Sequence, residues 1–324
     1  MSGPARLAVC IRHAGNDLVA AECVNLTGGA PDAHGLALCD DVSLVARSAY
    51  VRSGTEIIAH AGTLEGLVER VCAADFDATA FRIECVRTTD RFDIASLDAI
   101  IAVADGMRGF FPDLDNPQHR FLLVIREDGF WFGEIVVEFT TAYRKHHDKP
   151  YQTSNALPPR LARSLVNIVS PPARVILDPC CGSGSIPMEA AEMGLTAIAS
   201  DRNAIAVEKA RGNVAHFGYA VDIAQVDARD SLPTADAVIA DLPYGIQLDY
   251  AEDEARDILA SCARAAPVGV FVTKDDITPM LLDAGWAHVE TFRHRKLTRY
   301  TKGFERTVHR ARSVVFELTE PAAT

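Results

Sequence analysis

The sequence predicts an α/β domain with a parallel sheet in the C-terminal half of the chain and an α+β region before it. Between residues 175 and 273, short apolar runs rich in β-branched side chains alternate with helical stretches, as in a parallel sheet covered by helices. Before residue 140, strands and helices also alternate, but the turn Asp128-Gly129 joins two neighbouring strands as in an antiparallel hairpin. The two patterns indicate two different types of domain.

The composition is that of a folded globular protein. The chain has 324 residues, of which 48% are hydrophobic, enough for two domains with cores of their own. It has neither a long apolar run nor a signal-peptide pattern, so we expect a cytoplasmic protein with no membrane partner. Its 8 cysteines include no Cys-x-x-Cys pair, which favours a reduced protein that requires no metal. The net charge of −12 argues against nucleic-acid binding by the whole surface.

The elements divide the chain into four parts. Residues 1–74 predict a small α+β domain, and residues 75–139 predict a second one that ends in the hairpin. Residues 140–155 have little apolar periodicity and are interpreted as a linker to the α/β domain at residues 156–324. Before the linker, strands are predicted at 6–10, 36–38, 81–88, 120–126 and 130–139. Helices are predicted there at 18–26, 64–74 and 94–107.

A glycine turn follows the first strand of the predicted α/β domain. A Val-Ile-Leu run precedes the turn, and Asp178 ends this run with a carboxylate. Gly182 and Gly184 would let the backbone approach a ligand closely, where a side chain would block it. Residues 185–193 predict a helix, with Ser185 as a possible N-cap. A strand, a glycine turn and a helix N-terminus are typical of nucleotide binding, although a plain tight turn would share the short Gly-x-Gly pattern.

The turn differs from the fingerprint of nicotinamide dinucleotide sites. That fingerprint has a third glycine three residues after the second, where this chain has Pro187. The carboxylate of Asp178 at the strand end is also foreign to it. A carboxylate there suits a ligand that carries an ammonium group, such as the methionine part of S-adenosylmethionine. We therefore predict S-adenosylmethionine as the cofactor, with Asp178, Gly182 and Gly184 at its methionine end.

Acidic residues also end the second and third strands of this domain. Asp201 follows a strand at 196–200, about twenty residues beyond the glycine turn, where a ribose hydroxyl pair is usually bound. It could also cap the helix that follows. Asp227 and Ala228 follow a strand at 222–226, where an acid can accept a hydrogen bond from the adenine amine. An ordinary loop acid is an equal alternative for Asp227.

The fourth strand, at 236–240, leads into the tetrapeptide Asp241-Leu242-Pro243-Tyr244. The tetrapeptide resembles the Asp/Asn-Pro-Pro-Tyr signature of methyltransferases that act on exocyclic amines of nucleobases. Because the lone pair of such an amine is delocalised into the ring, the site must orient the amine and accept its N–H groups. The resemblance gives these tasks to the Asp241 carboxylate and the Leu242 carbonyl, while Pro243 rigidifies the turn and Tyr244 stacks on the base. Leu242 replaces the first proline of the signature but keeps the backbone carbonyl.

Two stretches of the chain are basic in spite of the negative net charge. One lies in the predicted linker, and the other spans residues 293–312, where Tyr300 and Phe304 interrupt a series of arginines and lysines. Basic residues with interleaved aromatics suit a nucleic-acid strand, while a solvated hairpin is the plainer alternative. The residues predicted to contact RNA are Arg144, Lys145, Lys149, Arg295, Lys296, Arg299 and Lys302.

The segment Asp113-Leu114-Asp115-Asn116-Pro117 before the hairpin resembles part of the THUMP domain, which binds tRNA in RNA-modifying enzymes. Over nearly the whole chain, the order of parts is similar to that of the THUMP-domain tRNA guanine-N2 methyltransferases. These enzymes combine a ferredoxin-like domain, a THUMP domain, a linker and a Rossmann-like class I methyltransferase domain. Length and domain order look most like the archaeal members that act on guanosine 10, often to the dimethyl product. The resemblance implies S-adenosylmethionine as cofactor and tRNA as partner.

Three other interpretations stay open. Family members that act at position 6, or on another RNA, share the architecture. An adenine-N6 DNA methyltransferase would carry a similar tetrapeptide, but no target-recognition insertion is visible in this sequence. A non-catalytic tRNA-binding module would be free to lose Asp178, Gly182, Gly184, Asp241 and Tyr244, which are all present. We expect the protein to be a monomer.

Overall fold

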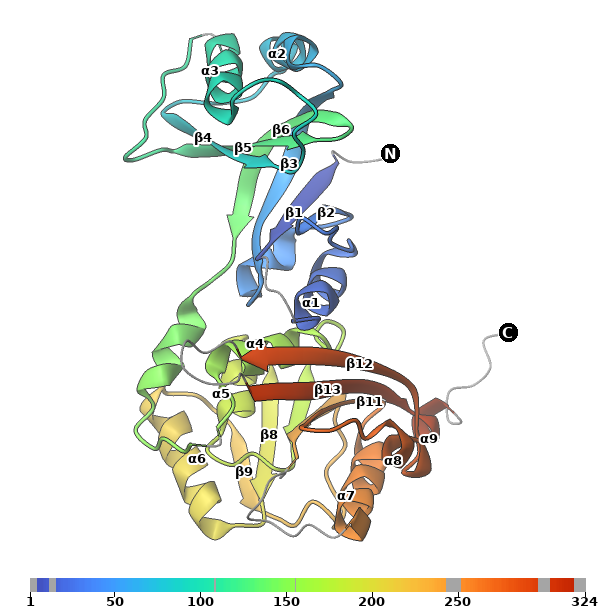
Figure 1. Cartoon of the computed structure of the whole chain (residues 1–324). Helices are drawn as coiled ribbons and strands as arrows, with labels where there is room; N and C mark the ends of the chain where they lie inside the picture. Colours follow the sequence, from blue (N-terminus) through green and yellow to red (C-terminus); the bar gives the residue numbers. More distant parts are fainter. Residues whose placement is uncertain are drawn as a thin grey trace, which may run out of the picture. The chain divides into compact units, whose positions relative to one another are not determined.

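The computed structural model divides the chain into two compact units (Figure 1). Unit 1 comprises Met1–Arg12 and Leu26–Phe139, and unit 2 comprises His13–Asn25 and Thr140–Thr324. The residues that the structure describes are 5–11, 16–107, 109–154, 156–242, 252–296 and 304–317.

Unit 1 contains a six-stranded sheet of order β2-β1-β3-β6-β5-β4. All neighbouring strands are antiparallel except β4 and β5, which are parallel. β3 pairs with β1 on one side and β6 on the other, so both predicted N-terminal domains contribute to one sheet. Their separation at residue 74 stays a prediction. The strands are β1 (Arg6–Cys10), β2 (Leu36–Cys39), β3 (Val51–Ala61), β4 (Phe81–Arg87), β5 (His119–Arg126) and β6 (Gly129–Glu138).

The core of unit 1 lies between this sheet and two helices, α2 (Leu64–Ala73) and α3 (Ser96–Gly106). Leu67 of α2, Val103 of α3 and Phe121 of β5 are fully buried in it. The predicted hairpin of β5 and β6 is confirmed. Its turn requires glycine, because Gly129 has a φ of 128° and a Cβ there would lie 2.2 Å from a backbone oxygen. A short 3-10 helix, η1 (Ser43–Arg47), precedes β3.

Unit 2 contains a seven-stranded sheet of order β12-β13-β11-β10-β7-β8-β9. Five neighbouring strands of this sheet are parallel, namely β11, β10, β7, β8 and β9. β13 runs antiparallel to both β11 and β12. The strand order reverses between β7 and β10, where ligands bind at the carboxyl ends of a parallel sheet. The predicted parallel strands are confirmed, and β12 and β13 add an antiparallel pair at one edge of the sheet. The strands are β7 (Val175–Asp178), β8 (Thr196–Asp201), β9 (Asp222–Gln225), β10 (Ala237–Asp241), β11 (Val268–Thr273), β12 (Trp286–Lys296) and β13 (Phe304–Ser313).

Helices pack against the sheet of unit 2. Val207 and Val214 of α6 form one apolar cluster with neighbours from the strands, and Ile258 and Leu259 of α7 belong to another. No helix within the described ranges is long and apolar enough to cross a membrane. The helices are α4 (Pro159–Asn167), α5 (Ser185–Glu192), α6 (Ala204–His216), α7 (Glu252–Ala265), α8 (Thr278–Asp283), α9 (Val314–Glu317) and the 3-10 helix η2 (Ala142–Asp148).

Two segments, the first helix and the stretch interpreted as a linker, belong to a different part of the fold than the sequence suggested. Most of the first helix, α1 (Leu18–Thr27), groups with unit 2, because Asn167 of α4 donates to Glu22 (2.6 Å) and accepts from Asn25 (2.7 Å). The stretch interpreted as a linker contains η2, which also belongs to unit 2 and buries His146. Both placements depend on contacts between residues far apart in the chain, which a local pattern does not reveal.

Candidate cofactor-binding and catalytic site

The glycine turn between β7 and α5 forms an open cradle. Gly182 and Gly184 have φ values of 54° and 84°, a region of backbone conformation that favours glycine. A Cβ on Gly182 would point into space with no atom within 4 Å, whereas one on Gly184 would meet Ala210 of α6 at 3.4 Å. The N-cap of α5 is Gly184, so the prediction of Ser185 as the cap was wrong. Because the left-handed glycine takes the cap position, Ser185 begins the helix instead.

Three carboxyl groups lie at the carboxyl ends of adjacent strands. Asp178 ends β7, Asp201 ends β8 and Asp241 ends β10, and β7 pairs with both other strands. Asp178 is 1% exposed, and this burial, with the nearby Asp201 and Asp241, raises its pKa well above the ordinary value. Because carboxylates that are buried close together repel one another, this edge of the sheet favours a ligand with a positively charged group.

Asp201 is bound to the glycine turn itself. Its Oδ2 accepts a hydrogen bond from the Gly182 amide (2.9 Å), and its Oδ1 accepts one from the Asn203 amide (2.9 Å). The side chain that caps α6 is Asn203, which accepts from the Ile205 amide (2.9 Å), rather than Asp201. Sequence reasoning missed this tether, although the spacing of Asp201 from the turn pointed to the correct place. The ribose contact of Asp201 stays a prediction.

Asp227 borders a hollow of about 360 Å³ beyond β9, lined by Arg202, Gln225, Val226, Asp227 and Asp230. Arg229 donates to Asp227 from Nη2 (2.7 Å) and Nε (3.0 Å), and these bonds help to lower the pKa of Asp227 to about 2. Ala228 is buried beside it. Asp227 is therefore an ionised acceptor at the rim of a hollow, and its contact with adenine, like that of Ala228, stays a prediction.

The predicted catalytic segment begins at the end of β10. Asp241 is half-buried, and the Leu242 amide donates to the Val272 carbonyl of β11 (3.1 Å). Leu242 is 7% exposed and packs in the apolar cluster that includes α7. This packing explains why an apolar side chain can replace the first proline of the signature. Pro243 and Tyr244 lie outside the described residues.

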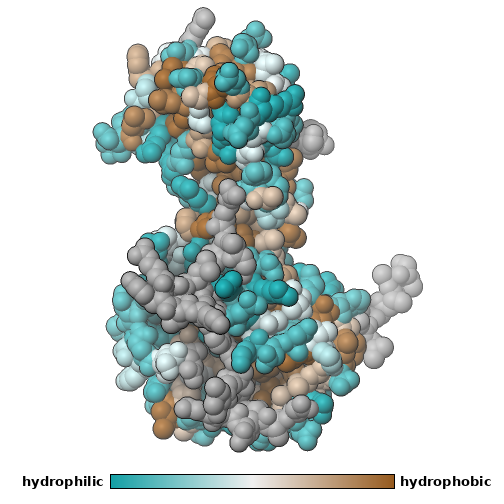
Figure 2. All heavy atoms as spheres, viewed as in Figure 1, coloured by the Kyte–Doolittle hydropathy of each residue, from teal (hydrophilic) through white to brown (hydrophobic). Residues whose placement is uncertain are grey.

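The residues predicted to contact RNA differ in their surroundings. Arg144 and Arg295 are exposed, Lys296 ends β12, and Arg299 and Lys302 lie outside the described residues. Lys145 is half-exposed and forms an ion pair with Glu192 of α5 (2.8 Å). Figure 2 shows hydrophilic side chains over the part of unit 2 where β12 and β13 lie.

The prediction that Lys149 contacts RNA at the surface was wrong. Its side chain is 4% exposed, and Nζ donates to Ser183 Oγ (3.2 Å) and Ser185 Oγ (2.9 Å). The ammonium group faces the glycine turn, so it does not offer the predicted surface contact to an RNA phosphate. The local run of basic residues gave the charge but not the direction of the side chain.

Residues 146–267 match the family described as "RMKL-like, methyltransferase domain". The matched residues, which run from within η2 to the start of β11, form a methyltransferase domain. The chain is 27% identical over 283 residues to the tRNA (guanine(10)-N2)-dimethyltransferase of Methanothermobacter thermautotrophicus, a match that covers 80% of this chain and 84% of the relative.

Two further relatives bear on the same assignment. The tRNA (guanine(10)-N2)-dimethyltransferase of Pyrococcus abyssi is 31% identical over 162 residues, which cover 47% of this chain and 49% of that protein. The tRNA (guanine(6)-N(2))-methyltransferase THUMP3 of Bos taurus is 26% identical, with 53% of this chain and 38% of that protein covered. Among solved structures, TrmN from Thermus thermophilus has a TM-score of 0.53 at 20% identity and covers 96% of this chain and 100% of its own, which shows a shared fold.

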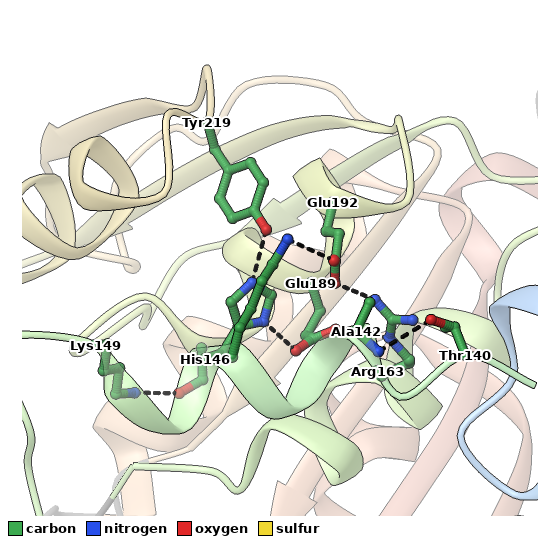
Figure 3. A network of polar contacts seen from close by, with 10 residues as sticks. Thr140, Ala142, His146, Lys149, Arg163, Glu189, Glu192 and Tyr219 are labelled. Atoms are coloured by element: carbon green, nitrogen blue, oxygen red, sulfur yellow. Dashed lines mark hydrogen bonds and ion pairs between the residues drawn. The ribbon is translucent and has the colours of Figure 1, made fainter.

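The methyltransferase domain holds η2 in place through a buried network of charges (Figure 3). Arg163 of α4 is 2% exposed, and its Nε donates to Glu189 Oε2 of α5 (2.8 Å) while its Nη2 bonds to Glu192. His146 of η2 contacts the other Glu189 oxygen and the Tyr219 hydroxyl (2.8 Å). We call His146, Arg163, Glu189 and Glu192 the buttress network. The acidic residues Glu189 and Glu192 within a helix of small apolar residues were the available sequence signal for it.

The buttress network also has the spacing of a metal site. Ligand atoms of His146, Glu189 and Glu192 lie within 4.8 Å of one another. However, Arg163 binds both carboxylates, and Lys145 binds Glu192 as well. Since these side chains already balance the negative charge, we interpret the network as ion pairing that fixes η2 on α4 and α5.

Replacing Asp201 by alanine should weaken cofactor binding. We expect a loss of about 1–3 kcal/mol in affinity for S-adenosylhomocysteine, because ribose hydroxyls and the Gly182 amide would lose their acceptor. Isothermal titration calorimetry measures this loss. Asp222→Ala, an exposed acid at the amino end of β9, is the matched control and should leave affinity unchanged. Equal affinities for the wild type and Asp201→Ala would exclude the ribose contact.

Proposed function

We propose that this protein transfers a methyl group from S-adenosylmethionine to the exocyclic N2 amine of a guanosine in tRNA. The observation that carries the proposal is the position of Asp241. It ends β10 beside β7, so the acid of the amine-methylating signature and the glycine turn lie on one edge of the sheet, where the strand order reverses. The relatives named for guanine-N2 methylation of tRNA include one that matches over 80% of the chain.

The residues at the strand ends fit S-adenosylmethionine. The open cradle at Gly182 allows close approach of a ligand, and the acids Asp178 and Asp201 favour the positive charges of this cofactor. Asp201 and the Asp227–Ala228 pair would bind the ribose and the adenine. The cofactor, when bound, supplies an activated methyl group on a sulfonium.

The task of the chain is then to present the guanine amine. Asp241 would orient it and accept an N–H hydrogen bond, with the Leu242 carbonyl as a second acceptor and Tyr244 as a stacking surface. A paired guanine hides its amine within the duplex, so the base must leave the stack to reach this edge. Because methyl transfer requires accurate placement of the nitrogen, the fixed position of Asp241 at a strand end suits this role.

Unit 1 and the exposed basic residues are proposed to bind the tRNA. The longer match to the guanosine-10 relative, over 80% of the chain, favours position 10. The position-6 relative matches 53% of the chain and makes that nucleotide the alternative. We further propose a cytoplasmic monomer that requires no metal.

Transfer of a radioactive methyl group from S-adenosylmethionine tests this proposal. Unmodified tRNA transcripts should become labelled, whereas a DNA duplex and a tRNA-free control should not. Labelled DNA with unlabelled tRNA would favour an adenine-N6 DNA methyltransferase. Cofactor binding without labelling of either the tRNA or the DNA would favour a non-catalytic module.

Charge reversal at exposed arginines should change how salt affects tRNA binding. Arg295→Glu or Arg144→Glu should reduce the slope of log affinity against log salt by about 1, because each loses one phosphate contact and its released counterion. Fluorescence anisotropy of labelled tRNA over a salt series measures the slope. Arg211→Glu, at an arginine of α6 that already pairs with Glu208, is the control and should keep the wild-type slope. An unchanged slope for both variants would remove these residues from the RNA-binding surface.

A further inference from the structure

We propose that Lys149 binds the carboxylate of the amino-acid end of the cofactor. The inference rests on the proposed function, because it specifies which group of S-adenosylmethionine this part of the site receives. It assigns to Lys149 a binding role at the glycine turn instead of a contact with RNA.

Lys149 reaches the glycine turn from the end of η2. Its ammonium donates to Ser183 Oγ (3.2 Å), between the two glycines, and to Ser185 Oγ (2.9 Å), at the first residue of α5. Figure 3 shows the Lys149 nitrogen bonded to a hydroxyl oxygen that does not belong to the buttress network. An ammonium group has three donors, and these two bonds use two of them.

In the described part of the chain, no carboxylate oxygen lies within 4.0 Å of the Lys149 ammonium nitrogen, so the charge of Lys149 has no counterion there. The carboxylate that acts on its pKa is Glu189, but His146 and Arg163 already bind both oxygens of Glu189. Lysine is almost never buried without a charged partner. Burial lowers the pKa of Lys149 to about 8, so a bound anion would stabilise the charged form. These facts point to an anionic ligand that completes the site.

The order of charges along the turn matches an amino-acid zwitterion. The turn begins at the buried acid Asp178, which suits the ammonium, and ends at Ser183 and Ser185, where Lys149 suits the carboxylate. These two ligand groups share one carbon atom, so their binding sites must be neighbours. The N-terminus of α5 adds a favourable potential for an anion at the same end of the turn.

The segment after η2 is fixed in place. Asn213 of α6 donates to the carbonyl oxygens of Ser183 (2.9 Å) and Tyr151 (3.1 Å) and accepts from the Tyr151 amide (2.8 Å). On the other side, the buttress network fixes His146. Lys149 is thus held between two anchors before any ligand binds, and such preorganisation increases affinity for a matching group.

Calorimetry with two ligands tests the proposal on the full-length protein. S-adenosylhomocysteine has the carboxylate, and its decarboxylated analogue lacks only that group. For Lys149→Met, the affinity for S-adenosylhomocysteine should fall about 10-fold or more, as for loss of a charged hydrogen bond, while the affinity for the analogue stays within about twofold. Lys149→Gln, whose amide can still donate to the serine hydroxyls, should show the same selective loss. Lys209→Met removes a lysine charge from α6 and should change neither affinity.

Two results would overturn the inference. An equal loss for both ligands in both Lys149 variants would mean that Lys149 only shapes the turn, and unchanged affinity for both would remove it from the site. If circular dichroism shows that the Lys149→Met protein does not fold, the test uses the affinities of Lys149→Gln for S-adenosylhomocysteine and for its decarboxylated analogue. Failure of the wild type to bind S-adenosylhomocysteine at all would instead contradict the proposed function, so the two failures are distinguishable.

Discussion

Replacing Asp241 by alanine should lower the turnover number for tRNA methylation by about 10²-fold or more, in the range for a lost acid–base group. The guanine amine would lose the acceptor that orients it, and a small displacement of the attacking nitrogen is costly in an in-line transfer. Single-turnover kinetics with the protein in excess over the tRNA measures the chemical step directly. The affinity for S-adenosylhomocysteine should change by no more than about threefold, since Asp241 is assigned to the base and not to the cofactor.

Asp241→Asn separates geometry from charge in the same experiment. Its amide oxygen can still accept a hydrogen bond, but the negative charge that favours the developing positive charge on nitrogen is lost. We expect turnover between that of the wild type and that of Asp241→Ala. If Asp241→Ala lost cofactor affinity by the same factor as turnover, Asp241 would belong to the cofactor site and the catalytic assignment would be wrong.

Replacing Arg163 by methionine should destabilise unit 2 by about 3–5 kcal/mol, the range for breaking a buried ion pair by removing one partner. Arg163 is 2% exposed, and its loss would leave the fully buried Glu189 and the nearby Glu192 without their main positive partner. Urea unfolding followed by tryptophan fluorescence measures this. The chain has 2 tryptophans, so a Trp131→Phe background leaves the buried Trp286 as the reporter of unit 2.

A surface ion pair provides the control for this experiment. Arg256→Met removes an arginine of α7 that is 45% exposed and pairs with Asp253, and it should cost no more than about 1 kcal/mol. A loss of the same small size for Arg163→Met would show that the buttress network does not hold η2. In that case Lys149 would also lack one of the two anchors that hold it in place before a ligand binds.

The sequence predicted the sheet and the glycine turn of the methyltransferase domain because their signals are local. Val175–Asp178 is an apolar run that ends in an acid, and both glycines have the positive φ values that such a turn requires. The acids at the strand ends came together because parallel strands place their carboxyl ends on one edge of a sheet. For these features, residue type and spacing were sufficient.

The surroundings of the basic residues could not be predicted in this way. Lys145 and Lys149 are four residues apart in one basic stretch, yet one is half-exposed and the other is buried against Ser183 and Ser185. Their difference depends on α5, which lies far along the sequence. The same reason explains why Arg163 and Glu189 were not foreseen as partners and why α1 was assigned to the N-terminal part.

We propose that this chain methylates the N2 amine of a guanosine in tRNA. The most direct test is mass spectrometry of an unmodified tRNA after incubation with the protein and S-adenosylmethionine, with nuclease fragments to locate the product. We expect N2-methylguanosine or N2,N2-dimethylguanosine at position 10 with the wild type, and neither product with Asp241→Ala. An unmodified tRNA, or a methyl group on adenosine instead of guanosine N2, would contradict it.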